Sequence, residues 1–93
     1  MARGPKLPRP QRILDRVLSG AADRNIRFDD LRNLVLGLGF AERIRGDHFI
    51  YTRSNVVEII NIQPGPEGHA KPYQVRQVRE LVVRYKLRLE EEQ

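Results

Sequence analysis

Residues 40–62 read FAERIRGDHFIYTRSNVVEIINI, and this stretch decides the fold. The pair Gly46-Asp47 interrupts it with glycine in the first position, which is the pattern of a two-residue type II′ hairpin turn. Apolar and aromatic residues on both sides of the pair favour extended backbone. We therefore expect a β-hairpin with strands over Phe40–Arg45 and His48–Arg53.

A third strand and a final helix follow the hairpin. Ser54-Asn55 indicates a second turn, and the β-branched run Val56–Ile62 predicts a strand that completes an antiparallel meander. Residues Gln63–Lys71 contain two prolines and two glycines and should form a loop. A helix should begin near Pro72, whose fixed φ suits a first turn. One face of that helix carries apolar residues: Val75, Val78, Leu81, Val82, Tyr85 and Leu89.

Two helices should precede the meander. The apolar residues Leu31, Leu34, Val35 and Leu38 recur with helical spacing. Asp29 is a suitable N-cap for that helix, Phe28 before it could act as a hydrophobic staple, and Gly39 would end it. A shorter helix is expected from Gln11 to Ser19, with Pro10 before it, Gly20 at its end and a linker over Ala21–Asn25.

These elements predict an α+β domain with the order α–α–β–β–β–α. The helices on either side of the meander should cover one sheet face, where Phe40, Ile44, Phe49 and Tyr51 would join the core. The other face would then be open to a ligand. Register beyond Ser54-Asn55 stays undetermined, because a slip of one residue would exchange the two faces of the third strand.

A length of 93 residues fits one domain. We expect a disordered basic tail over 1–9, a helix and linker over 10–25, the main domain over 26–89, and an acidic tail over 90–93. The chain has no cysteine and only two histidines, which excludes disulfides and a cysteine- or histidine-rich metal cluster. With no long apolar run and no signal peptide visible, we expect a cytoplasmic protein without membrane contact.

The charge pattern suggests a polyanionic partner. The net charge is +5, and residues 71–88 alone hold six basic residues against one acidic residue. A basic helix of this kind is typical of nucleic-acid binding, although such a face can also be merely solvated or can bind an acidic protein.

The hairpin should also place three polar side chains together. A two-residue turn pairs Arg45 with His48 and Arg43 with Ile50, and opposed residues share a sheet face. Arg43, Arg45 and His48 should therefore cluster on the open face. An imidazole can move the proton of an RNA 2′-hydroxyl or 5′-oxygen, while guanidinium groups stabilise the charge on the phosphate.

No metal or other cofactor is needed for this chemistry, because the nucleophile belongs to the RNA. Tyr51, Lys71 and His69 are open candidates for a second proton-transfer group. From the residues alone, RNA binding without catalysis remains the alternative, and a protein-interaction domain for an acidic partner is a third reading. A helix-turn-helix DNA-binding domain is disfavoured, because three strands separate the helices.

Three segments resemble HicA-family toxins. Residues 39–51 (GFAERIRGDHFIY) are similar to a family signature in which Gly-Phe closes a helix, an Arg lies three residues before a Gly, and Gly-Ser-His-His and an aromatic follow. Residues 60–64 (INIQP) and 70–79 (AKPYQVRQVR) resemble one branch of the family. The resemblance extends from Ile26 to Leu87.

The resemblance implies a fold like that of a double-stranded RNA-binding domain. It further implies the toxin of a type II toxin–antitoxin pair, a metal-independent endoribonuclease that cleaves mRNA and is blocked by a HicB-type antitoxin covering its active site. By position, His48 matches the family's catalytic histidine, while Arg43 and Lys71 match its basic residues; we add Arg45 as a phosphate ligand. The free toxin is expected to be a monomer.

Two residues depart from the family pattern. Asp47 stands where the family usually has Ser, and its carboxylate would repel phosphate unless Arg45 pairs with it. Phe49 stands where the family has a second His, which removes one possible proton-transfer group.

Overall fold

The computed structural model describes residues 7–90, and these confirm the α+β class. The tails expected at the two ends lie partly in residues 1–6 and 91–93, outside the described residues. In chain order the elements are α1 (Arg9–Ser19), α2 (Phe28–Gly37), β1 (Ala41–Arg45), β2 (His48–Arg53), β3 (Val56–Ile62), the short 3-10 turn η1 (Pro66–Gly68) and α3 (Pro72–Tyr85).

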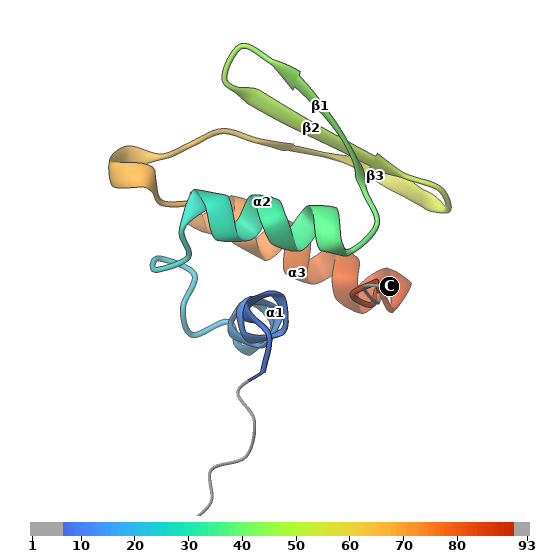
Figure 1. Ribbon diagram of the computed structural model, residues 1–93, viewed down its shortest axis with the longest axis horizontal. Coiled ribbons are helices and arrows are strands. Elements are labelled where there is room, and N and C mark those ends of the chain that lie inside the picture. The colour runs from blue at the N-terminus through green and yellow to red at the C-terminus, as the bar shows by residue number, and fades with distance from the viewer. Residues whose placement is uncertain (1–6, 91–93) are drawn as a thin grey trace, which may run out of the picture.

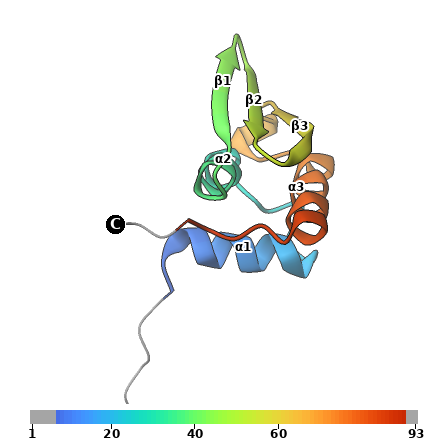
Figure 2. The same ribbon diagram turned by 90° about the vertical axis from the view of Figure 1, so that its right-hand side faces the viewer.

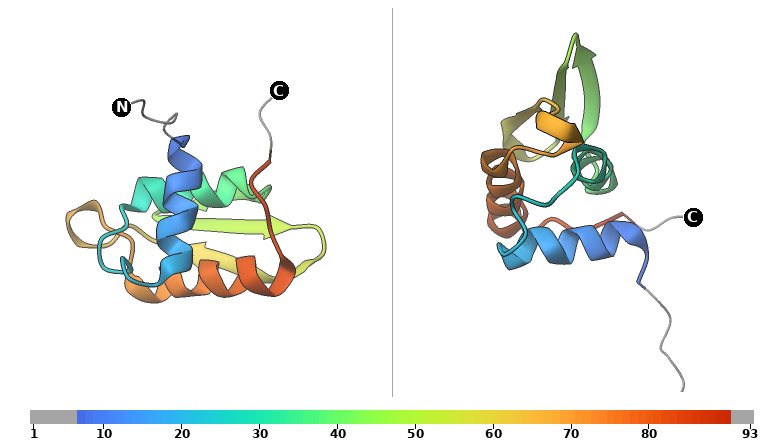
Figure 3. Two further views of the ribbon diagram at one scale, coloured as in Figure 1. Left: turned by 90° about the horizontal axis from the view of Figure 1, so that it is seen from below. Right: turned by 90° about the vertical axis from the view of Figure 1, so that its left-hand side faces the viewer.

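The domain is built in three layers. The antiparallel sheet has the order β1-β2-β3, and α2 and α3 lie side by side on one of its faces (Figures 1 and 2). Helix α1 crosses beneath α2 and α3, on the side away from the sheet (Figure 3). The prediction that two helices cover one sheet face is thus confirmed, and within residues 7–90 no helix lies on the opposite face.

Strand register follows from the two tight turns. Gly46 has a φ of +59° and Asp47 does not have a positive φ, the combination expected for a type II′ turn. Arg45 pairs with His48 and Arg43 with Ile50, as the hairpin predicts. Across the second turn, Phe49 pairs with Ile62 and Tyr51 with Ile60, with an irregularity between Tyr51 and Arg53.

This register settles the two faces of β3. Ile60 and Ile62 are buried under the helices, whereas Val57, Ile59 and Asn61 are exposed on the open face. Burial of each isoleucine contributes about 1.5–3 kcal/mol, so a register slip that exposed both would be costly.

Helix α1 begins two residues earlier than the expected Gln11. Arg9 is its first residue, and its guanidinium binds the carboxylate of Asp30 through two hydrogen bonds of 2.8 and 2.9 Å. The apolar side chains Ile13, Leu14 and Val17 are buried against the other helices. Arg9 therefore belongs to the folded domain and not to a disordered tail.

The predicted start of α2 is wrong. The helix begins at Phe28 with Arg27 as N-cap, and no side chain caps it. The backbone of Arg27 is already fixed by a bridge to His69, so helical hydrogen bonding starts before Asp29. Phe28 lies inside the helix and is buried, while Asp29 sits in the first turn, where the helix dipole favours acidic groups.

The last helix ends earlier than its apolar pattern suggested. α3 stops at Tyr85, and Lys86 adopts a left-handed conformation with a φ of +53°. The chain then runs back across the helices, where Leu87 is buried and the Glu90 N–H donates to Gly37 O at 2.8 Å. Leu89 thus packs on the core from an extended segment rather than from a helix face.

One predicted core residue lies outside the core. Phe40 and Tyr51 are buried and Phe49 is partly buried, but the side chain of Ile44 is 49% exposed. Ile44 does point toward the helical side of the sheet, opposite Phe49. The tip of the β1–β2 hairpin extends beyond α2 and α3 (Figure 2), and Ile44 lies next to that tip, just before Arg45, which leaves its side chain exposed.

Candidate active site on the open sheet face

His48 is the first residue of β2 and lies on the sheet face opposite α2 and α3, which no helix of the described part of the chain covers. Its side chain is 48% exposed, yet both ring nitrogens have partners from the neighbouring chain segment. Nδ1 lies 3.2 Å from the side-chain oxygen of Asn61, and Nε2 lies 3.3 Å from the side-chain nitrogen of Gln63. Because an amide oxygen only accepts and an amide nitrogen only donates, these contacts fit a neutral ring with its proton on Nδ1.

Sequence reasoning did not assign a role to Asn61 or Gln63. Asn61 lies between the buried Ile60 and Ile62, so its side chain points to the open face. Gln63 follows Ile62, the partner of Phe49, and therefore comes beside His48. The alternation of isoleucine with polar residues over 60–63 indicates that Asn61 and Gln63 share one face. Only the register of β2 and β3 shows that this face is the one that carries His48.

Arg43 and Arg45 lie on the same face as His48. Arg45 is directly opposite His48, and Arg43 is diagonal to it, two residues along β1. Both side chains are exposed, and neither forms an ion pair with any residue between 7 and 90. The predicted cluster is therefore present, with two guanidinium groups that have charge to offer an anion.

Asp47 does not pair with Arg45 within residues 7–90. Its carboxylate is 72% exposed, and Oδ1 lies 3.9 Å from Nε2 of His48. At that distance it would attract the imidazolium formed when His48 takes up a proton. The condition under which Arg45 would neutralise this carboxylate is therefore not met within residues 7–90, and its nearest ionisable contact there is His48.

A polar network on the core side of the sheet holds β1 and β2 against α2. Glu42 accepts two hydrogen bonds from Arg32, at 2.8 and 2.9 Å, and one from the Tyr51 hydroxyl at 2.8 Å. The bonds from Arg32 are the main cause that lowers the pKa of Glu42. Burial, followed by the bond to Glu42, raises the pKa of Tyr51 well above its usual value.

This network excludes Tyr51 as the second proton-transfer group. Its side chain is fully buried, and it lies on the sheet face opposite His48. The raised pKa also keeps its proton in place, so the phenol serves as a structural hydrogen-bond donor.

Phe49 lies on the core side as well. Its ring packs edge-to-face on Phe28, with 4.9 Å between centroids, and the Arg32 guanidinium lies 5.1 Å from its centroid. A side chain at this position cannot reach a substrate bound beside His48. Phe49 therefore contributes to packing on the core side and presents no group on the open face.

The remaining candidates are not joined to this cluster. Lys71 precedes the first turn of α3, where its backbone N–H bonds the Gln74 side chain, and nothing links its ammonium group to His48 within the described chain. His69 is half-buried in the loop before α3, and its backbone bridges to Arg27. The strand register thus places Arg43, Arg45 and His48 together, while among the described residues no hydrogen bond or ion pair connects Lys71 or His69 to them.

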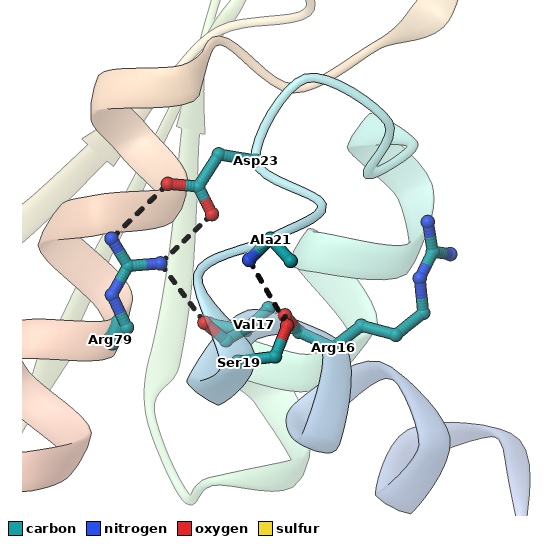
Figure 4. A network of polar contacts seen from close by, with 6 residues as sticks. All are labelled: Arg16, Val17, Ser19, Ala21, Asp23 and Arg79. Carbon is teal, nitrogen blue, oxygen red and sulfur yellow. Dashed lines mark hydrogen bonds and ion pairs between the residues drawn. The ribbon is translucent and has the colours of Figure 1, made fainter.

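The basic helix carries fewer available charges than its sequence suggested. Arg79 binds Asp23 at 2.8 and 3.1 Å and the carbonyl of Val17 at 3.0 Å, which ties α3 to the end of α1 (Figure 4). Arg84 pairs with Glu58 on β3. Four basic residues of the stretch make no ion pair within 7–90: Lys71, Arg76, Lys86 and Arg88.

Two further observations concern metal binding and membrane-spanning helices. No cluster of three or more metal-ligating side chains occurs between residues 7 and 90. Within the same span, none of the helices has the length and apolar character needed to cross a membrane.

Comparisons with protein-family models, with curated proteins and with solved structures gave no match for this chain.

Proposed function

We propose that this protein is a HicA-like endoribonuclease, the toxin of a type II toxin–antitoxin pair, which cleaves mRNA in the cytoplasm. One observation carries the proposal. An exposed imidazole, contacted at both ring nitrogens, lies beside two guanidinium groups that have no acidic partner within residues 7–90, on a sheet face that no helix covers.

The arrangement fits cleavage by the RNA's own 2′-hydroxyl. His48 Nε2 takes the proton from this hydroxyl, the 2′-oxygen attacks phosphorus, and the bond from phosphorus to the 5′-oxygen breaks. The leaving 5′-oxygen takes a proton from the imidazolium or from water, which the open face admits. The products are a 2′,3′-cyclic phosphate and a 5′-hydroxyl.

The two arginines stabilise the charge that develops on the phosphate. Their forked donors match phosphate oxygens, and they sit on a strand that the partly buried network of Glu42 helps to hold in position. We assign Lys71 to another phosphate along the RNA strand, since no contact places it at the reacting one. The reaction uses no metal ion.

The order of elements supports the same proposal. Helix α2, the three strands and α3 follow one another as the resemblance to HicA toxins implies, and we propose that this part adopts a fold like a double-stranded RNA-binding domain. A HicB-type antitoxin would neutralise the toxin by covering the open face. The added helix α1 lies on the far side of α2 and α3 and leaves that face clear (Figure 3).

Inducible expression in a bacterial host tests the proposal. We expect the wild type to arrest growth and to fragment mRNA, whereas His48→Ala does neither at equal expression. His69→Ala is the matched control, because it removes the other histidine and should behave as the wild type does. Arrest by His48→Ala would contradict the assignment of His48.

Purified protein separates catalysis from RNA binding. A binding module without catalysis would retain RNA with an affinity that falls by about 0.7 log units per phosphate for each log unit of salt, and it would yield no fragments. Our proposal predicts both the salt-dependent affinity and the fragments. The loss of affinity in Arg43→Ala and Arg45→Ala would identify the phosphate contacts.

A further inference from the structure

The amide side chains of Asn61 and Gln63 contact His48, and the proposed reaction gives neither of them a role. We infer that Asn61 is a positioning residue that sets the tautomer of His48, so that Nδ1 carries the proton and Nε2 keeps the lone pair. The consequence for catalysis rests on the proposed ribonuclease function, while the tautomer is a property of the protein alone.

Asn61 is suited to this role because its strand is fixed. The neighbours Ile60 and Ile62 are buried, and they pair with Tyr51 and Phe49 on the same strand that begins at His48. Packing on the other face of the sheet therefore fixes the backbone of Asn61 beside His48, and its amide oxygen lies 3.2 Å from Nδ1. An acceptor at this distance favours an N–H at the ring atom that it faces.

The preference matters because a free neutral imidazole favours the proton on Nε2. In that form the lone pair would lie on Nδ1, against Asn61, and Nε2 could not take a proton from a substrate. The oxygen of Asn61 reverses this preference. The contact of the Gln63 amide nitrogen with Nε2, at 3.3 Å, is consistent with the same tautomer, because the amide donates to the lone pair on Nε2. A substrate hydroxyl would replace Gln63 at this lone pair.

The chain offers a clean spectroscopic test, because it contains only two histidines. Long-range ¹H–¹⁵N spectra of the full-length protein, at a pH well above the roughly 6.5 of a free imidazole, report which ring nitrogen carries the proton. His69, whose ring has no such amide pair among the described residues, is the internal reference. His48→Gln assigns the signals.

We expect His48 to be protonated on Nδ1 in the wild type and to shift toward Nε2 in Asn61→Ala. Asn61→Asp should restore the Nδ1 form, since a carboxylate oxygen accepts the same bond. The cleavage rate should fall roughly 10- to 100-fold in Asn61→Ala, as for other displaced catalytic groups, and recover in Asn61→Asp. Thr52→Ala is the control, because Thr52 lies on the same face but is paired with Ala41. It should change neither the tautomer of His48 nor the cleavage rate.

An Nε2-protonated His48 in the wild type, or a tautomer that Asn61→Ala leaves unchanged, would overturn the inference. These outcomes are independent of the proposed function. A protein that holds His48 in the Nδ1 form but cuts no RNA would support the inference and refute the ribonuclease. If the wild type cuts RNA but Asn61→Ala leaves the tautomer of His48 unchanged, the ribonuclease would be supported and the inference about Asn61 refuted.

Discussion

Replacing Phe49 by histidine introduces the second His that the proposed likeness to HicA toxins would call for, and it tests which sheet face residue 49 occupies. The Phe49 ring lies 4.9 Å from the ring of Phe28 and 5.1 Å from the guanidinium of Arg32. An edge-to-face pair contributes about 0.5–1.5 kcal/mol, and an exposed cation–π contact about 0.5–1 kcal/mol. Because an imidazole keeps part of these contacts, we expect Phe49→His to cost about 1–2 kcal/mol, or roughly 4–15 °C in Tm.

The loss of stability in Phe49→His should be larger at low pH than at high pH. The introduced imidazole would lie beside Arg32 on a partly buried face, so its pKa in the folded protein should fall below the value of about 6.5 in the unfolded chain. The unfolded state then binds more protons in acid, and the deficit relative to the wild type should grow as pH falls below about 6.5. Cleavage of RNA should not increase.

Thermal unfolding at pH 8 and pH 5.5 measures both effects. Phe49→Leu is the matched control, since it removes the same aromatic contacts and adds no titrating group, and its deficit should not change between the two pH values. A Phe49→His protein that is as stable as the wild type at both pH values and cuts RNA faster would refute the reasoning. Residue 49 would then face the substrate.

Four other variants test the contacts that hold the site. Tyr51→Phe removes the hydroxyl that donates to Glu42, so urea denaturation should show a loss of about 0.5–1.5 kcal/mol; an unchanged midpoint would argue against this bond. The pKa of Glu42 is lowered in the folded protein, so its stabilisation is present above its ordinary pKa of 4.5 and is lost as pH falls through the folded value. Glu42→Gln should accordingly be less stable than the wild type at pH 7 and should lose less stability in acid, and urea midpoints across pH 3–7 check this. Lys86→Gly should raise stability by about 0.5–1 kcal/mol, because residue 86 has a φ of +53°, and a lower Tm would count against that strain. Arg79→Ala loses the two bonds to Asp23 and should cost about 1–3 kcal/mol while RNA cleavage by the folded protein continues; lost cleavage at full folding would instead give Arg79 a role in RNA binding.

Local turn chemistry made the hairpin predictable. Gly46-Asp47 specified the turn, the turn specified the pairing of Arg45 with His48, and strand alternation then placed the arginines and the histidine on one face. None of these steps needed information from distant parts of the chain. The same holds for the sheet order, because a meander of short connections has few alternatives.

Errors arose where distant segments decide the outcome. Ile44 is apolar and lies on the core side of the sheet, but the hairpin tip projects beyond α2 and α3, so the side chain stays exposed. The apolar pattern of α3 continues to Leu89, although the chain leaves the helix at Lys86 to pack against α2. Arg79 is one of the six basic residues counted in 71–88, but it binds Asp23, which lies 56 residues away in sequence, and this pairing could not be predicted.

The contacts of His48 with Asn61 and Gln63 could not be predicted from the sequence for a similar reason. Asn61 and Gln63 come from β3 and the residue after it, beyond a turn whose register the sequence left undetermined. A shift of one residue would have turned Asn61 into the core. The burial of Ile60 and Ile62 selects the observed register, and that burial depends on where α2 and α3 lie.

The most direct test of the central claim is cleavage of a short RNA by the purified protein in the presence of a metal chelator. The wild type should release a fragment ending in a 2′,3′-cyclic phosphate, and it should fail on the same RNA carrying 2′-O-methyl groups. His48→Ala should cut neither RNA. Cleavage by His48→Ala at the wild-type rate, or cleavage of the 2′-O-methyl RNA by the wild type, would contradict a mechanism in which His48 activates the RNA's own hydroxyl.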